Sequence, residues 1–455
     1  MARARGLDRG GRDLLGRRPV TAQPHLFPEN ARGPVAAPSR GHMASALLGL
    51  AMLGTVVVVY RLGHGLTFHG ERWDDLVNRR GWGVGTFLEP HDGGLSLVPV
   101  ALFRLVRAIG LGDYGVYRAL LLLAHCACVA LVFILLRRRL DPLFALAGAL
   151  AVLFLGRAWP VLLVPERISY LLGIAFGLGL LLALEGRRDG LAAVLLTGAL
   201  ASSTVGLVFA VVALVELAVG RDGPASRYWV GLAPLVLYGV WALAYGNPAT
   251  AGTSVGAGTL VHANFPGVPA YLADGVAAAF GALTGLAVEW GRPLAVVTAV
   301  VVGVQLSRGA PLTARLLGLL VAAGAYWAVL GLFRGQVIAA TDARYVYFGA
   351  VVIVLVAGEV FAGAEAGRRS LALLAGLLAV AAVASYGVVR DAARSLRAAS
   401  GAVGGAAAGR LGTAEFGRLG AGTGIRSASN PAAMKGTNVK TCTTTAHASA
   451  RDSST

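Results

Sequence analysis

The chain has 455 residues, of which 56% are hydrophobic and only 14% charged, and its mean hydropathy is +0.68. These values exclude an ordinary water-soluble domain and are typical of a polytopic membrane protein. The formal net charge of +17 comes from short arginine clusters between apolar runs and from the two ends of the chain. This distribution favours anionic membrane lipids over nucleic acid as the basic residues' partner.

The apolar runs predict an all-α fold, a polytopic transmembrane helix bundle. Residues 1–42 are rich in Arg, Gly and Pro and predict a disordered basic arm. The first span follows at 44–62, close to the ~20 residues that cross a bilayer core of ~30 Å. With the spans below, we expect about 11 crossings, within a range of about 9 to 13, in a domain at 43–390. The remaining spans are predicted at 116–136, 142–157, 168–184, 191–203, 205–219, 229–245, 292–307, 312–332, 346–363 and 370–388.

Three segments need a separate interpretation. Residues 95–109 are amphipathic and are expected to lie on the outer surface. Residues 270–290 are expected to form an interfacial or re-entrant helix on the outer side, since a further crossing there would invert every later span. Residues 391–455 are of low complexity and predict a disordered tail.

Arginine clusters set the expected orientation. If the N-terminal arm is cytoplasmic, the eleven predicted spans place all the clusters between spans on that side: Arg137–Arg139, Arg187–Arg188, Arg221 with Arg227, Arg308 with Arg315, and Arg368–Arg369. The positive-inside rule then predicts a multi-pass protein of the cell (plasma) membrane with a cytoplasmic N-terminus.

An acidic loop after the first span is the strongest candidate for a functional site. Acidic residues are scarce elsewhere, yet this loop contains Glu71, Asp74, Asp75 and Asp92, together with His91. Carboxylates at a membrane boundary indicate binding or chemistry. The other outer loops contribute arginines, so the outer side suits a substrate with a charged headgroup and a lipid tail. These outer arginines are Arg157, Arg167 and Arg344.

Several short peptides resemble bacterial multi-span glycosyltransferases of the GT-C superfamily. They are Glu71-Arg72-Trp73-Asp74-Asp75 in the first outer loop, Pro90-His91-Asp92-Gly93-Gly94-Leu95-Ser96 before the amphipathic segment, Tyr117-Arg118 at the next span, and Asp342-Ala343-Arg344-Tyr345 before a late span. The layout at 44–390 is similar to lipid-phosphate-sugar-dependent, mannosyltransferase-like members. The resemblance implies transfer of a sugar from a polyprenyl-phosphate carrier at the outer face, in the bacterial cell envelope. It also implies that Asp74 or Asp75 is the catalytic base.

The residue types fit such a transfer independently. A carboxylate can take the proton of the acceptor hydroxyl, and arginine can stabilise the charge that develops on the leaving phosphate. We therefore expect Asp74 and Asp75 to be catalytic. We expect the substrate to be bound by Glu71, His91, Asp92, Arg167 and Arg344. A divalent cation is left open as a cofactor, because no His/Asp spacing is diagnostic of a metal.

Each of these residues also has a structural interpretation. Asp74 and Asp75 are equally consistent with solvated loop charges, and Arg344 with an arginine that snorkels at the end of a span. Arg167 can pair with its neighbour Glu166, and His91 can order its loop. His125, in the middle of a span, is expected to be packed and hydrogen-bonded.

Two other classes of function stay open at this level. A transporter or lipid flippase should carry charged or unwound elements near the bilayer midplane. A non-catalytic membrane scaffold should tolerate every substitution in the outer loop. An outer cavity that contains Arg344 and the loop carboxylates would favour the enzyme. The oligomeric state is open.

Overall fold

The computed structural model describes residues 40–67, 82–91, 94–220, 225–246, 262–309, 312–335, 338–365 and 367–420, with only the backbone for 401–420. Its helices, in chain order, are α1 (Arg40–Leu62), α3 (Val84–Leu88), α4 (Leu97–Ala108), α5 (Tyr114–Arg137), α6 (Pro142–Leu153), α7 (Trp159–Leu163), α8 (Ile168–Glu185), α9 (Asp189–Leu200), α10 (Val205–Val219), α11 (Trp229–Tyr245), α13 (Val268–Thr284), α14 (Val288–Ser307), α15 (Ala314–Arg334), α16 (Ala343–Val360) and α17 (Arg368–Gly420). Short 3-10 turns η1 (Gly156–Ala158) and η2 (Pro165–Arg167) flank α7.

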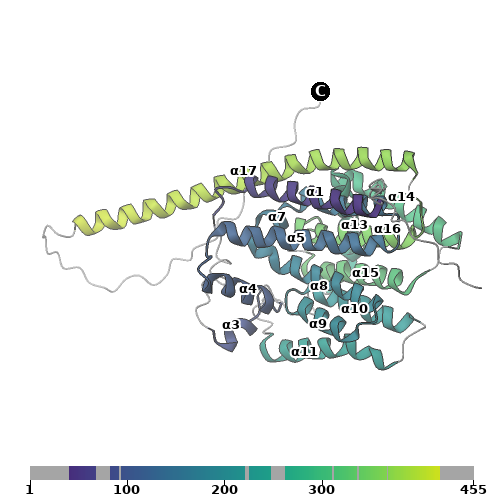
Figure 1. The fold of residues 1–455 in the computed structure, drawn as a ribbon. Helices are drawn as coiled ribbons and strands as arrows, with labels where there is room; N and C mark the ends of the chain where they lie inside the picture. The colour runs from purple at the N-terminus through teal and green to yellow at the C-terminus, as the bar shows by residue number, and fades with distance from the viewer. Residues whose placement is uncertain are drawn as a thin grey trace, which may run out of the picture.

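The protein is an all-α, polytopic helix bundle, as the sequence predicts (Figure 1). Within the described ranges, nine helical segments are long and apolar enough to cross a membrane, and α9 and α10 are shorter apolar helices. Each of the eleven predicted spans corresponds to one of these segments. The spans of α10 and α11 coincide with their predicted bounds.

The bundle has two chemically different ends. Arg118, near the start of α5, donates to the carbonyl oxygens of Val59 (2.9 Å) and Gly63 (2.6 Å) at the end of α1. At the other end of α5, Arg137 donates to Ser45 Oγ near the start of α1. These contacts make α1 and α5 antiparallel neighbours. We call the end with Arg137 the basic end, and the end with α3, α4 and η2 the site end; Figure 1 shows α3 and α4 together at the latter.

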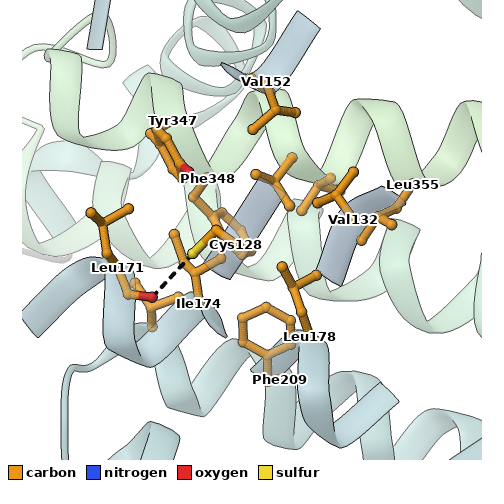
Figure 2. Close-up of a cluster of buried hydrophobic side chains, with 14 of the residues drawn as sticks. Cys128, Val132, Val152, Leu171, Ile174, Leu178, Phe209, Tyr347, Phe348 and Leu355 are labelled. Atoms are coloured by element: carbon orange, nitrogen blue, oxygen red, sulfur yellow. Dashed lines mark hydrogen bonds between the residues drawn. The ribbon is translucent and has the colours of Figure 1, made fainter. Parts of the chain in front are cut away.

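The core is formed where α5, α8, α10 and α16 meet (Figure 2). Cys128 Sγ donates to the Leu171 carbonyl oxygen at 3.3 Å. His125 is 1% exposed, and its two ring nitrogens lie 2.9 Å from Tyr347 Oη and 3.3 Å from the Leu153 carbonyl oxygen. The prediction of a packed, hydrogen-bonded His125 is therefore confirmed. Because lipid tails are as apolar as leucine, close packing and such hydrogen bonds hold the helices together.

Small residues permit this close packing. A Cβ on Gly177 of α8 would lie 2.2 Å from the Phe209 ring of α10, so only glycine fits there. A Cβ on Gly318 of α15 would lie 3.1 Å from the Val212 carbonyl oxygen of α10. Helices α10 and α15 therefore touch at this level, near the basic end.

Helix α13, predicted as interfacial or re-entrant, is not a surface helix. It packs against α14, α15 and α16, and Ala277 and Ala279 on it are fully buried. It begins at the site end, where Asn264 Nδ2 donates to the Leu332 carbonyl oxygen. It turns at Gly285 (φ 73°), and α14 ends at Ser307, a short connection before α15 starts at the basic end. The first turn of α14 folds back along α13, where Gly291 lies against Ala277 and Arg292 pairs with Asp274. The burial of α13 rejects the interfacial alternative, and the re-entrant one stays a prediction.

Two peripheral segments complete the fold. Helix α4 buries Val100, Phe103 and Val106 along one face, as its amphipathic pattern predicts. Its Phe103 ring packs edge-on against Tyr117, with centroids 4.9 Å apart. Helix α17 continues through residue 391, where we expected a disordered tail, as far as Gly420. Ala393 on it is fully buried beside α1 and α7, so the tail prediction is wrong for this part of the chain.

Candidate functional site

A cavity of about 430 Å³ lies at the site end, between α8, α10, α15 and the start of α16. Three of the predicted substrate-binding residues, His91, Arg167 and Arg344, line it. They come from three segments far apart in the sequence. The cavity lies in the size range of small-molecule sites, and it combines a few charged groups with largely apolar walls.

Arginines form one wall of the cavity. Arg344 Nε and Nη2 lie 2.9 and 3.2 Å from the two carboxylate oxygens of Asp342, which also accepts the Arg344 backbone N–H at 3.0 Å. Asp342 is the N-cap of α16, so a helix cap also orients the guanidinium. Arg334, at the end of α15, lines the same wall. Arg344 therefore does more than snorkel, because its side chain is held in a fixed direction.

The charge of Asp342 is also held by this arrangement. Burial raises the pKa of its carboxyl group, but the hydrogen bonds from Arg344 and the charges of Arg344 and Arg167 outweigh burial, so the net pKa is lowered. Arg167 thus lies close enough for its positive charge to stabilise the Asp342 carboxylate. Arg167 itself also pairs with Glu166 at 3.4 Å, as its structural interpretation predicts. Both members of that pair line the cavity.

Hydroxyl groups also line the cavity, in two sets that we call the hydroxyl wall (Ser203 and Thr204) and the floor (Tyr170 and Tyr326). The turn between α9 and α10 brings Ser203 and Thr204 to the cavity, and Ser203 Oγ accepts the Val205 N–H at 3.4 Å. On the floor, the Tyr170 and Tyr326 hydroxyl oxygens are 2.9 Å apart. Sequence reasoning missed this wall. The run Ser202-Ser203-Thr204 between two apolar helices was the available signal.

His91 reaches the cavity through a short backbone bridge. The His91 and Gly94 backbones exchange two hydrogen bonds of 2.9 and 3.0 Å. A Cβ on Gly94 would lie 2.8 Å from Thr204 Cγ2, which explains glycine at this position. The next segment is anchored as well, because the Val98 N–H donates to the Ala201 carbonyl oxygen. His91 therefore orders its loop and lies at the site.

The remaining walls are apolar and come from α10 and α15. These helices touch at Gly318, but nearer the site end their residues Val208, Val211 and Val329 line the cavity instead. Val329 is 52% and Phe333 44% exposed, and both line the cavity. The cavity is therefore open beside this part of α15.

Four predicted site residues, Glu71, Asp74, Asp75 and Asp92, lie outside the described residues. Arg157, one of the outer arginines, does not line the cavity. Among the residues that the structure does describe, no group of three His, Cys, Asp or Glu side chains could hold a metal ion. The described residues therefore do not test the divalent cation that the sequence analysis left open as a cofactor.

A second polar cluster, at the basic end, was not predicted as a unit. Arg315 is 6% exposed and donates to both Glu216 carboxylate oxygens, at 3.2 and 3.0 Å, and to the Leu181 carbonyl oxygen at 2.8 Å. Arg139 lies 3.0 Å from Glu359. Each of these guanidinium groups is paired with a carboxylate, which is typical of a structural ion-pair network that ties α5, α10, α15 and α16 together.

Comparisons with known proteins add no relative. No family model matches the chain, and neither the search of curated proteins nor the search of solved structures gives a significant match. The likeness to GT-C enzymes therefore rests on the short peptides and the helix layout. What the site can do has to be argued from its own geometry.

Proposed function

We propose that this protein is an integral membrane glycosyltransferase that moves a sugar from a polyprenyl-phosphate carrier to an acceptor at the site end of the bundle. The observation that carries the proposal is that arginines and the apolar side chains of α10 and α15 line one and the same cavity. A phosphate ester of a long isoprenoid alcohol likewise has a charged and an apolar part. Its anionic group suits the forked guanidinium of Arg344, and its chain suits the space between α10 and α15.

The cavity also supports the chemistry of transfer. When the bond between the sugar and the phosphate oxygen breaks, negative charge grows on the phosphate, and preorganised Arg344 and Arg167 would stabilise it without reorganising. The acceptor oxygen forms the new bond to the sugar and loses its proton to a base. By the GT-C resemblance, Asp74 or Asp75 is that base. The hydroxyl wall at Ser203 and Thr204 would contact the sugar.

The proposed base belongs to a loop whose described neighbours lie at the same end of the bundle. Leu66, just after α1, is 5% exposed and packs with Leu122 and Leu163. After the loop, α3 ends at Leu88, whose carbonyl oxygen accepts from Trp241 Nε1 at 2.8 Å. These contacts keep both stems at the site end, so the connectivity is compatible with carboxylates that reach the cavity.

The transporter alternative has less support. It needs a path that opens at both ends, whereas buried Arg315 and its carboxylate partners join the helices at the basic end. Within the described spans, the buried side chains of His125 and Tyr347 hydrogen-bond to each other.

The proposal is tested by a transfer assay on the full-length protein in proteoliposomes. A panel of polyprenyl-phosphate sugars is supplied with membrane acceptors, and the released polyprenyl phosphate is measured. We expect release with at least one donor and its loss in Asp74→Asn/Asp75→Asn. Arg344→Gln should reduce release, and Arg292→Gln, which alters an exposed ion pair with Asp274, is the matched control. Full release by the double Asn variant would refute the assignment of the base, and no release with any donor would refute the function.

A further inference from the structure

A second groove, of about 280 Å³, lies between α1 and α17 and is separate from the cavity at the arginines. Its walls are Gly54 and Val58 of α1 and Ala382 and Tyr386 of α17, and Gly156 contributes to its floor. Space is open beside Gly54, because a Cβ placed there meets no atom within 4 Å. Val58 and Tyr386 are 42% and 48% exposed, so the groove opens on the surface that faces lipid.

One polar group inside this groove needs a partner. Ser385 lines the groove, is 6% exposed, and its buried Oγ has no hydrogen-bond partner among the described residues. Its backbone is fixed against the turn η1, since a Cβ on Gly156 would lie 2.5 Å from Ser385 Cα. A buried hydroxyl without a partner is unfavourable. In the bilayer core no water is present to supply one.

Positive charge lies one turn further along α17. The Arg390 guanidinium lies 5.9 Å from the centroid of the Tyr386 ring at the mouth of the groove. It is 42% exposed, and its Nε also lies 3.4 Å from the carboxylate of Asp391, which is 65% exposed. Arg390 is five positions after Ser385, which is about 7.5 Å along a helix. Along α17 toward the site end, the hydroxyl donor of Ser385 is thus followed by the cation of Arg390.

We propose that the α1–α17 groove binds one acyl chain of an anionic phospholipid, with an ester carbonyl oxygen accepting from Ser385 Oγ and the phosphate beside Arg390. The acyl ester supplies the acceptor that Ser385 lacks. A polyprenyl chain is a hydrocarbon without any acceptor at that depth, so this chemistry favours a phospholipid over the lipid proposed for the cavity. The inference holds whether or not the protein transfers sugars.

The test is a lipid titration of the delipidated full-length protein, read by native mass spectrometry. The probes are phosphatidylglycerol, phosphatidylcholine and polyprenyl phosphate. We expect phosphatidylglycerol to bind about fivefold more tightly than phosphatidylcholine, as one nearby arginine provides about 1 kcal/mol. Ser385→Ala, which removes the donor and keeps the packing, should weaken phosphatidylglycerol binding about fivefold.

Filling the groove is an independent variant. Gly54→Leu should abolish the phosphatidylglycerol complex, whereas Gly303→Leu, at an equally open position on α14, should leave it intact. Each side chain enters open space, so the fold should persist, and helical circular dichroism checks this. The proposal is overturned if Ser385→Ala and Gly54→Leu bind phosphatidylglycerol like the native protein, if phosphatidylcholine binds equally well, or if polyprenyl phosphate displaces phosphatidylglycerol from this groove. Transfer activity is not read in this test, so its outcome is distinct from that of the proposed function.

Discussion

Replacing Arg344 with glutamine tests the electrostatic part of the cavity most sharply. The Arg344 side chain is 21% exposed and Asp342 30%, so solvent screens this pair only in part. A charge-assisted hydrogen bond to a phosphate oxygen contributes about 1.5–3 kcal/mol. Its loss should weaken polyprenyl-phosphate binding by about 10- to 150-fold. The variant also leaves the Asp342 carboxylate facing the phosphate, which acts in the same direction.

The assay is a binding titration of polyprenyl phosphate to the protein in nanodiscs. Asp342→Asn/Arg344→Gln removes both charges and should recover part of the loss, because the repulsive carboxylate is gone. Arg292→Gln should bind within about twofold of the native protein, since an exposed pair is worth at most about 1 kcal/mol and lies outside the cavity. Equal affinities for Arg344→Gln, Arg292→Gln and the native protein would refute the reasoning.

Three further outcomes follow from other contacts. The pKa of Asp342 is lowered in the folded protein, so the ionised carboxylate stabilises the fold above about pH 4, and this stabilisation is lost as the pH falls through the folded pKa. The difference in melting temperature between the native protein and Asp342→Asn should therefore vanish below that range. A difference that grows with acid would contradict this. Arg315→Met should lower the free energy of unfolding by about 3–5 kcal/mol, because it leaves the Glu216 carboxylate without its partner. In thermal unfolding in detergent, the double variant Arg315→Met/Glu216→Gln should regain part of this stability. An equal loss of stability in the single and the double variant would argue against the ion pair. Gly177→Ala should destabilise by about 1–3 kcal/mol, because the new methyl meets an aromatic ring. Gly303→Ala, in open space, should be neutral or stabilising, and equal melting temperatures of the two alanine variants would reject close packing at Gly177.

The sequence predicts the helices well because apolar length is a strong local signal. The run at 205–219, for example, has no proline and no glycine after Gly206, and it appears as α10 with the same bounds. Helix α13 shows the limit. Its apolar composition does not distinguish a surface helix from a buried one, and only the small residues Ala277 and Ala279, packed against neighbouring helices, decide it.

The site was predictable only in part, for a similar reason. Arg167 and Arg344 stand out locally, because each is a charge at the boundary of an apolar run. The turn at Ser202–Thr204 and the Tyr170–Tyr326 floor carry little local signal, since hydroxyl side chains are ordinary in helix turns. Their role arises from helices α8, α10 and α15 meeting in three dimensions, which a linear pattern does not contain.

The central claim is that one cavity receives both the phosphate and the chain of a lipid carrier. Its most direct test is an experimental structure of the full-length protein in nanodiscs with polyprenyl phosphate added. We predict phosphate density within hydrogen-bond distance of Arg344, with the chain leaving between α10 and α15 next to Val329. Phosphate density outside the cavity, or a cavity that stays empty at saturating lipid, would contradict the account.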